Sequence, residues 1–146
     1  MDFQLSEEQT LIQKTAKEFA NTELAPGSIE RDEKKIWPKE AIDKMANLGF
    51  MGMMTNPKWG GEGMDAISYT IAMEEISSAD ASVGVIMSVN NSLVCSLIEK
   101  YATDIIKDKY LTSLASGKKL GAFSLSEPQS GSDASNMKTF AKKEGS

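Results

Sequence analysis

The stretch from residue 120 to residue 134 reads LGAFSLSEPQSGSDA. Its first half, Leu120–Ser126, is a short apolar run with small polar residues, which predicts a strand whose end faces a polar ligand. Pro128 has no N–H to donate, so it would end the hydrogen-bond ladder of that strand. Small residues form the loop that follows, where Gly131 lets the backbone approach a neighbouring group closely. Such a loop either binds a phosphate or the polar edge of a ring, or is an ordinary surface turn, and composition alone leaves both interpretations open.

A more specific pattern covers residues 123–133, which read FSLSEPQSGSD. They match every fixed position of the signature aromatic-x-Leu-Ser/Thr-Glu-Pro-x-x-Gly-Ser-Asp, so the chain resembles the acyl-CoA dehydrogenases, whose flavin-binding signature this is. The resemblance extends along the rest of the chain. It includes MDFQLSEEQ at residues 1–9, the Trp59-Gly60-Gly61 loop, MEEISSADAS at 73–82 and LASGKK at 114–119, while MSVNNSL at 87–93 is most similar to short-chain, butyryl-CoA-type members.

The resemblance implies a mainly α fold in an N-terminal fragment of a longer protein. Residues 1–119 would form an N-terminal all-α domain, and residues 120–146 would contribute the first strands of a middle β-barrel domain. The family's second flavin motif and its catalytic glutamate would lie beyond residue 146, so the resemblance implies no catalytic residue in this chain. We therefore expect the fragment alone to be inactive and to bind FAD weakly or not at all.

The function implied by the resemblance is that of an FAD-dependent acyl-CoA dehydrogenase, a flavoprotein oxidoreductase of fatty-acid β-oxidation. Such an enzyme oxidises an acyl-CoA, here a short-chain one, to the trans-2-enoyl-CoA and passes the electrons to an electron-transferring flavoprotein, and the full-length protein would be a homotetramer. The implied FAD contacts are Phe123, Leu125, Ser126, Gly131 and Ser132, and Ser132 would also contact the substrate. Two alternatives stay open, a non-catalytic helical interaction module and an acyl-CoA oxidase-like relative.

Composition narrows the classes of function. The chain has 146 residues and a formal net charge of −5, which argues against a nucleic-acid surface and against binding to an anionic membrane. It has no histidine, which excludes a Ser-His-Asp triad and most zinc sites. One cysteine, Cys95, cannot form an internal disulfide. With the acidic start at Met1–Phe3, these features predict a cytoplasmic bacterial protein, or a mitochondrial-matrix protein in its mature form.

Hydrophobic spacing predicts about five helices before residue 120. A capping box at Ser6–Gln9 would begin the first, and Leu24–Gly27 would end it before a short solvated helix over 28–35. A second long helix would follow Pro38 and be capped by Gly49, and a third would begin at Asp65.

Two later helices follow from apolar runs. Ser82–Ile98 is apolar almost all round and predicts a buried central helix, since a membrane span needs about 20 such residues and Asn90-Asn91 interrupts this run. Buried asparagines there would need hydrogen-bond partners inside the protein. The last helix would open at Thr103, with Ile106, Tyr110 and Leu114 on its inner face.

Overall fold

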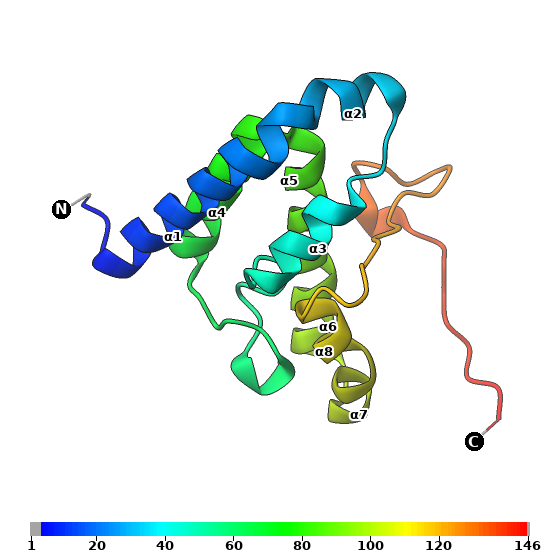
Figure 1. Cartoon of the computed structure of the whole chain (residues 1–146). Helices are drawn as coiled ribbons and strands as arrows, with labels where there is room; N and C mark the ends of the chain where they lie inside the picture. The colour runs from blue at the N-terminus through cyan, green and yellow to red at the C-terminus, as the bar shows by residue number, and fades with distance from the viewer. Residues whose placement is uncertain (1–3, 146) are drawn as a thin grey trace.

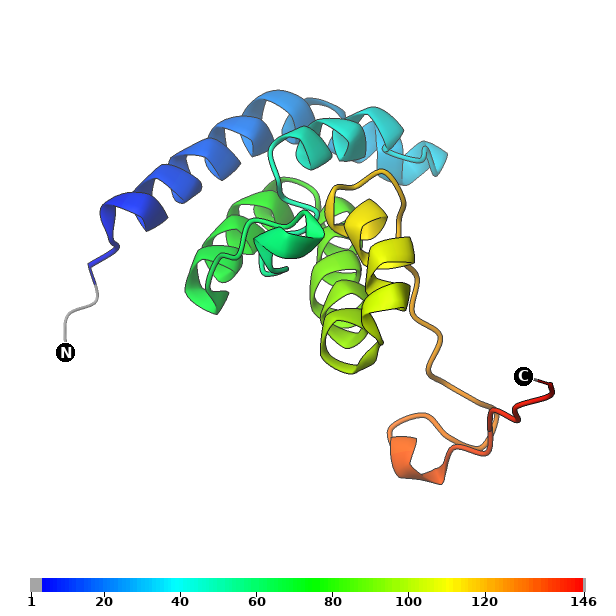
Figure 2. The same cartoon turned by 90° about the horizontal axis from the view of Figure 1, so that it is seen from below.

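The computed structural model describes residues 4–145 and shows a helical domain followed by an extended segment (Figures 1 and 2). The prediction made for Met1–Phe3 falls outside that range. The helical elements are α1 (Glu7–Phe19), η1 (Ala20–Leu24), η2 (Ala25–Gly27), α2 (Ser28–Lys34), α3 (Lys39–Asn47), η3 (Pro57–Trp59), α4 (Ala66–Ala79), α5 (Ala81–Ser88), η4 (Val89–Cys95), α6 (Ser96–Tyr101), α7 (Asp104–Ile106), η5 (Lys107–Leu111), α8 (Thr112–Ala115) and η6 (Ala134–Asn136). The predicted mainly α class is confirmed.

The start of α1 forms because its first turn satisfies its own free amides. Ser6 Oγ accepts from the Gln9 amide at 3.1 Å, and Gln9 Oε1 accepts from the Ser6 amide at 3.0 Å. This reciprocal capping box was predicted and is confirmed. The buried face of α1 then packs along α4 (Figure 1).

The predicted end of the first helix at Leu24–Gly27 is wrong. The backbone passes through a π segment, η1, and a 3₁₀ turn, η2, and continues into α2 before it stops at Lys35, whose φ is 54°. Pro26 does not break this path because it lies in the first turn of η2, where its missing N–H is not needed.

The main core lies between α1, α3, α4 and α5. Ala16, Leu24, Met45 and Ile76 are fully buried there, and Phe19 meets Phe50 edge to face at 6.3 Å between ring centroids. The connection after α3 is part of this core, with its buried members Phe50, Met51 and Met53.

The helical run from α5 through η4 to α6 is less buried than predicted. Val83, Met87 and Cys95 are fully buried, whereas Val85 is 61% exposed. Within the described chain this run, Ala81–Tyr101, is the helix whose length and apolar composition would allow it to cross a membrane. We interpret it as a core helix, because its polar residues Asn90 and Asn91 bond to backbone carbonyls of other segments.

The last helix, α7–η5–α8, opens at Thr103 as predicted, but of the three residues predicted on its inner face only Leu114 is buried. Ile106 and Tyr110 are each 40% exposed, while Leu111 and Leu114 are buried with Trp59 and Cys95 in a second core cluster. The π segment η5 explains the shift, because its wider turn moves the buried stripe away from the spacing of a regular α-helix.

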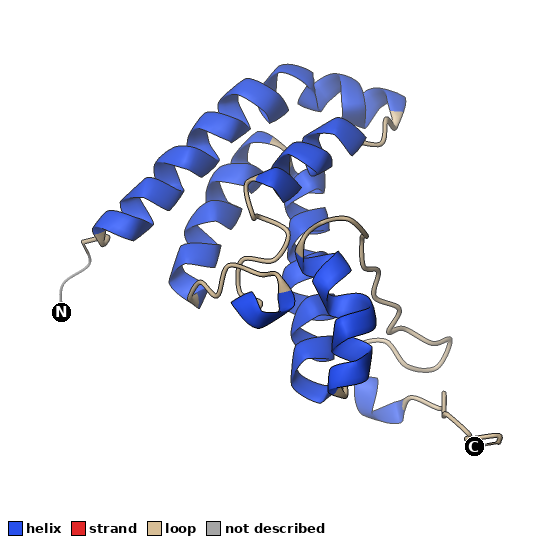
Figure 3. Ribbon diagram, turned by 60° about the horizontal axis from the view of Figure 1, so that its bottom comes forward, coloured by secondary structure: helices blue, strands red, loops and turns tan. Residues whose placement is uncertain are grey.

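The strand predicted at Leu120–Ser126 is not formed in residues 4–145, and neither is one at Met137–Lys142, where apolar and polar residues alternate in part as is typical of a strand (Figure 3). A strand requires a neighbouring strand to bond with, and within the described chain neither segment has one. The two β-type bonds present join Glu127 and Ser130 across a tight turn. The expected start of a β-barrel domain is therefore not shown.

Candidate functional site

The candidate site begins where the extended segment leaves the helical domain. The Gly121 amide donates to Asn90 Oδ1 at 2.9 Å. A side chain is not tolerated here, since a Cβ on Gly121 would lie 2.5 Å from Val94 Cγ1. Gly121 is thus held against η4, two residues before the first residue of the flavin-like pattern.

The next residues offer free polar groups. For Ala122–Ser126 the described chain provides no hydrogen-bond partner to any backbone amide or carbonyl. Phe123 and Leu125 are each 41% exposed, and Ser126 is also exposed. The segment therefore presents unpaired backbone groups, the hydroxyls of two serines and two large apolar side chains to a partner.

A closed turn follows this segment. Glu127 and Ser130 exchange two backbone hydrogen bonds of 2.8 and 3.0 Å, and the buried Ser130 donates from Oγ to the Asp133 carbonyl at 2.7 Å. Gly131 and Ser132 are exposed on this turn, and a Cβ on Gly131 would meet no atom within 4 Å. The tip of the turn is consequently open to a ligand.

Glu127 closes the base of this loop, a role that sequence reasoning missed. Its carboxylate accepts from the Lys138 amide at 2.8 Å, from the Thr139 amide at 2.9 Å, and from the side-chain amide of Gln129. These bonds, that from Lys138 foremost, lower the pKa of Glu127 to about 2. The separation in sequence is 11 and 12 residues, so no local pattern could have indicated them.

The five predicted flavin contacts lie along one open segment and do not line a common cavity. A shallow hollow of about 450 Å³ on the same segment is lined by other residues: Glu127, Pro128, Gln129, Lys138, Thr139 and Phe140. The free backbone groups and hydroxyls nevertheless suit the polar edge of an isoalloxazine ring, and Phe123 and Leu125 suit its apolar faces. The residues present therefore fit a flavin.

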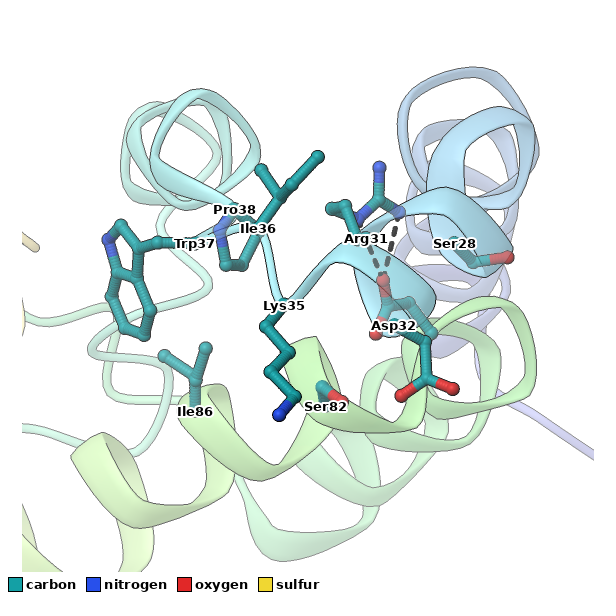
Figure 4. A pocket seen from close by; sticks show the side chains of 10 residues that line it. Ser28, Arg31, Asp32, Lys35, Ile36, Trp37, Pro38, Ser82 and Ile86 are labelled. Atoms are coloured by element: carbon teal, nitrogen blue, oxygen red, sulfur yellow. Dashed lines mark hydrogen bonds and ion pairs between the residues drawn. The ribbon is translucent and has the colours of Figure 1, made fainter.

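A second hollow, of about 290 Å³, lies where α2 meets α5 (Figure 4). Trp37 and Ile86 form its apolar end. At its other end Arg31 bonds Asp80 Oδ2 through Nε at 3.0 Å and through an Nη at 2.8 Å, and also bonds the Leu24 carbonyl. Asp80 Oδ1 accepts from the Val83 amide at 3.1 Å. Arg31 and Asp80 are thus engaged in holding helix ends together.

The part of the chain that the structure describes shows neither a cluster of metal ligands nor a reactive thiol. No group of three or more Cys, Asp or Glu side chains is placed to hold a metal ion among residues 4–145. Burial raises the pKa of the Cys95 thiol to about 11, so it stays protonated at neutral pH and is a poor nucleophile.

The Trp59-Gly60-Gly61 loop is a packing element. A Cβ on Gly61 would lie 2.2 Å from the Thr55 carbonyl oxygen, and the buried Trp59 ring lies under Lys58 Nζ at 4.3 Å from its centroid. Backbone and side chains of this chain already fill the space around these glycines.

Comparison with known proteins decides the family. The model of the acyl-CoA dehydrogenase N-terminal domain matches residues 6–118. This chain belongs to the acyl-CoA dehydrogenase family. The matched residues contain every helix from α1 to α8, and they include the run Ala81–Tyr101.

Relatives within the acyl-CoA dehydrogenases are close to this chain over nearly all of its length. The short-chain-specific acyl-CoA dehydrogenase of Clostridium acetobutylicum is 43% identical over 145 residues, which are 99% of this chain and 38% of that protein. The structure of butyryl-CoA dehydrogenase from Megasphaera elsdenii superposes with a TM-score of 0.86 at 42% identity, over 95% of this chain and 37% of the other. The chain thus spans little more than a third of the length of these relatives.

One further acyl-CoA dehydrogenase structure bears on the cofactor. The glutaryl-CoA dehydrogenase of Mycobacterium smegmatis, solved in complex with FADH2, superposes with a TM-score of 0.86 at 32% identity, over 91% of this chain and 34% of the other. A relative of this fold therefore holds a flavin.

Proposed function

We propose that this chain is the N-terminal part of an FAD-dependent acyl-CoA dehydrogenase that oxidises a short-chain acyl-CoA to the trans-2-enoyl-CoA. The observation that carries the proposal is the 43% identity with a short-chain-specific acyl-CoA dehydrogenase over 99% of the chain. Identity with the glutaryl-CoA dehydrogenase of Mycobacterium smegmatis is lower, at 32%, which favours a short acyl chain without a terminal carboxylate over a glutaryl chain.

The proposed FAD contacts are Phe123, Leu125, Ser126, Gly131 and Ser132. Their free backbone groups and open side chains support the assignment, because a flavin needs both polar partners for its ring edge and apolar surface for its faces. We place Ser132 at the junction of flavin and substrate, on the exposed turn that Glu127 closes.

In this proposal the reaction removes one α-proton and one β-hydride from the acyl chain. When bound, FAD supplies the hydride-accepting chemistry, and the protein supplies binding and orientation. Residues 121–132 of this chain bind and orient, and the base that takes the α-proton belongs to the portion of the relatives that this chain does not span. An electron-transferring flavoprotein would take up the electrons.

The natural protein would act in the bacterial cytoplasm, or in the mitochondrial matrix, as a homotetramer. Bacterial and mitochondrial relatives support these two locations about equally. The short-chain-specific enzyme of Clostridium acetobutylicum is 43% identical to the chain, and that of human mitochondria is 42% identical. A tetramer would also cover apolar side chains that are exposed here, such as Ile105 and Phe140.

Product analysis tests the proposed function. The natural full-length protein is incubated with butyryl-CoA, palmitoyl-CoA or glutaryl-CoA and an electron-transferring flavoprotein, and the thioesters are identified by mass. We expect butyryl-CoA to lose two hydrogens fastest. Faster turnover of palmitoyl-CoA would overturn the short-chain assignment, oxygen consumption without the acceptor would indicate an oxidase-like enzyme, and a protein without flavin would indicate a non-catalytic module.

A further inference from the structure

Asn90 connects three separate segments through one buried side chain. Its Nδ2 donates to the Met51 carbonyl at 2.7 Å and to the Leu114 carbonyl at 3.0 Å, and its Oδ1 accepts from the Gly121 amide at 2.9 Å. The side chain is fully buried. Both of its donor hydrogens and its acceptor are therefore used by backbone groups, one of which belongs to the extended segment.

The Gly121 bond is the only hydrogen bond that residues 120–126 make within the described chain. The segment has no strand partner here, so this bond, together with the close approach of the Gly121 backbone to Val94, holds it where it leaves the helical domain. Phe123 follows two residues later in the chain, so a displacement of Gly121 would also move Phe123.

The backbone around Asn90 deviates from a regular α-helix. Asn90 lies in the π segment η4, Val89–Cys95, and such segments are frequent at functional sites because the wider turn changes the direction of nearby side chains. Here consecutive residues point to different partners: Asn91 donates to the carbonyls of Phe50 and Met87, at 2.8 and 3.0 Å, and does not contact Gly121.

We propose that Asn90 is a positioning residue for the flavin site: through the Gly121 amide it fixes where the stretch Phe123–Ser132 stands relative to the helical domain. The part of this inference that concerns flavin binding rests on the proposed function. The hydrogen bond between Asn90 and Gly121 does not depend on that function. Asn90 touches neither flavin nor substrate in this account and acts through Gly121.

Asn91 supplies the matched control. Asn90→Ala and Asn91→Ala each remove two bonds from Nδ2 to core carbonyls, and only Asn90→Ala also removes the acceptor of Gly121. Asn90→Asp would stand in this buried site as the neutral acid. It retains an oxygen that can accept from Gly121 and can donate to only one of the two carbonyls, so it tests positioning with the donated bonds reduced.

The first measurement is amide hydrogen exchange at Gly121 in the natural full-length protein. We expect protection of the Gly121 amide in the parent protein, in Asn91→Ala and in Asn90→Asp, and its loss in Asn90→Ala. An unprotected Gly121 amide in the parent protein, or protection that survives Asn90→Ala, would overturn the inference whether or not the protein binds flavin.

The second measurement is the dissociation constant of FAD, with the visible spectrum of the bound flavin. We expect Asn90→Ala to raise the constant roughly tenfold and to shift the flavin bands, and Asn91→Ala and Asn90→Asp to change it less than about twofold. Equal weakening by both alanine variants would reduce Asn90 to a packing role. Absence of flavin from the parent protein would instead contradict the proposed function. In that case hydrogen exchange at the Gly121 amide would still test whether the Asn90–Gly121 bond forms.

Discussion

Gly61 and Gly131 are two glycines in opposite surroundings. An alanine at Gly61 would place its Cβ 2.2 Å from the Thr55 carbonyl oxygen, whereas one at Gly131 would meet nothing within 4 Å. We expect Gly61→Ala to lower the free energy of unfolding by about 1–3 kcal/mol, the usual effect of overpacking. Gly131→Ala should change it by less than about 0.5 kcal/mol, as surface substitutions do. Denaturant unfolding measures both, and equal effects would contradict the assignment of the Trp59-Gly60-Gly61 loop to packing.

The thiol of Cys95 should be inert in the folded protein. Burial raises its pKa to about 11, and a thiol is nucleophilic only as the thiolate, so below that pH the protonated form dominates. We expect slow labelling by iodoacetamide at pH 8 in native protein and rapid labelling in denaturant. Fast labelling of the native protein would mean that the cluster of Trp59, Cys95, Leu111 and Leu114 opens readily.

At this scale the sequence predicted side chains with local roles better than those with distant partners. Ser6 and Asp65 cap the helices expected of them, because capping is decided within three residues. The bonds that the Gly121 amide donates to Asn90 and the Lys138 amide donates to Glu127 cross 31 and 11 residues, and no local spacing encodes such contacts. The flavin contacts were predicted by resemblance and stay a prediction.

The joint between α2 and α5 depends on Asp80, which serves two elements at once. It caps α5 through the Val83 amide and pairs with Arg31, and both side chains of the pair are largely buried. We expect Asp80→Ala to cost about 3 kcal/mol, since it removes a cap and leaves a guanidinium without its carboxylate. Asp80→Asn keeps the cap and should cost about 1 kcal/mol less.

The control for this joint is the exposed pair Lys34–Glu30 on α2. Glu30→Gln should cost less than about 0.5 kcal/mol, because solvent screens such pairs. Thermal or denaturant unfolding compares the three variants. An Asp80→Ala variant no less stable than Glu30→Gln would show that the pair with Arg31 does not hold the joint.

The loop closed by Glu127 should resist acid. Hydrogen bonds from the Lys138 and Thr139 amides lower its pKa from 4.5 to about 2, so the carboxylate is stabilised by the folded loop. That contribution is fully present above pH 4.5 and is lost as the pH falls toward 2. We expect the Lys138 and Thr139 amide signals in NMR to titrate near pH 2 and to move at neutral pH in Glu127→Gln. Titration of these signals near pH 4.5, the ordinary pKa of the Glu127 carboxyl, would contradict the role of Glu127 in closing the loop.

Among the elements, helix starts were predicted well, and so was the end of α3 at Gly49, whose φ is 77°, whereas the end predicted at Leu24–Gly27 was wrong. The start at Ser6 follows from side chains, whereas the path through Leu24–Gly27 depends on tertiary support: Arg31 bonds the Leu24 carbonyl and holds α2 against Asp80. The predicted strands fail for a related reason, because pairing depends on a second strand and not on the segment's own alternation.

At the scale of the whole molecule, the site residues lie on one open segment outside the helical core (Figure 2). Ligand sites usually bury about 70–90% of their ligand, and this segment covers one side of a flavin at most. We therefore expect the 146-residue chain, expressed alone, to bind FAD weakly or not at all and to show no turnover. Equilibrium dialysis with FAD measures this, and a stoichiometric flavin retained by the chain alone would contradict it.

The central claim, that the natural protein is a flavin-dependent short-chain acyl-CoA dehydrogenase, is tested most directly by anaerobic addition of butyryl-CoA to the purified full-length protein. The visible absorption of its bound flavin is followed as the thioester is added. We expect butyryl-CoA to bleach the flavin at once and palmitoyl-CoA to do so far more slowly. Bound flavin that butyryl-CoA leaves oxidised, or a full-length protein with no flavin at all, would contradict it.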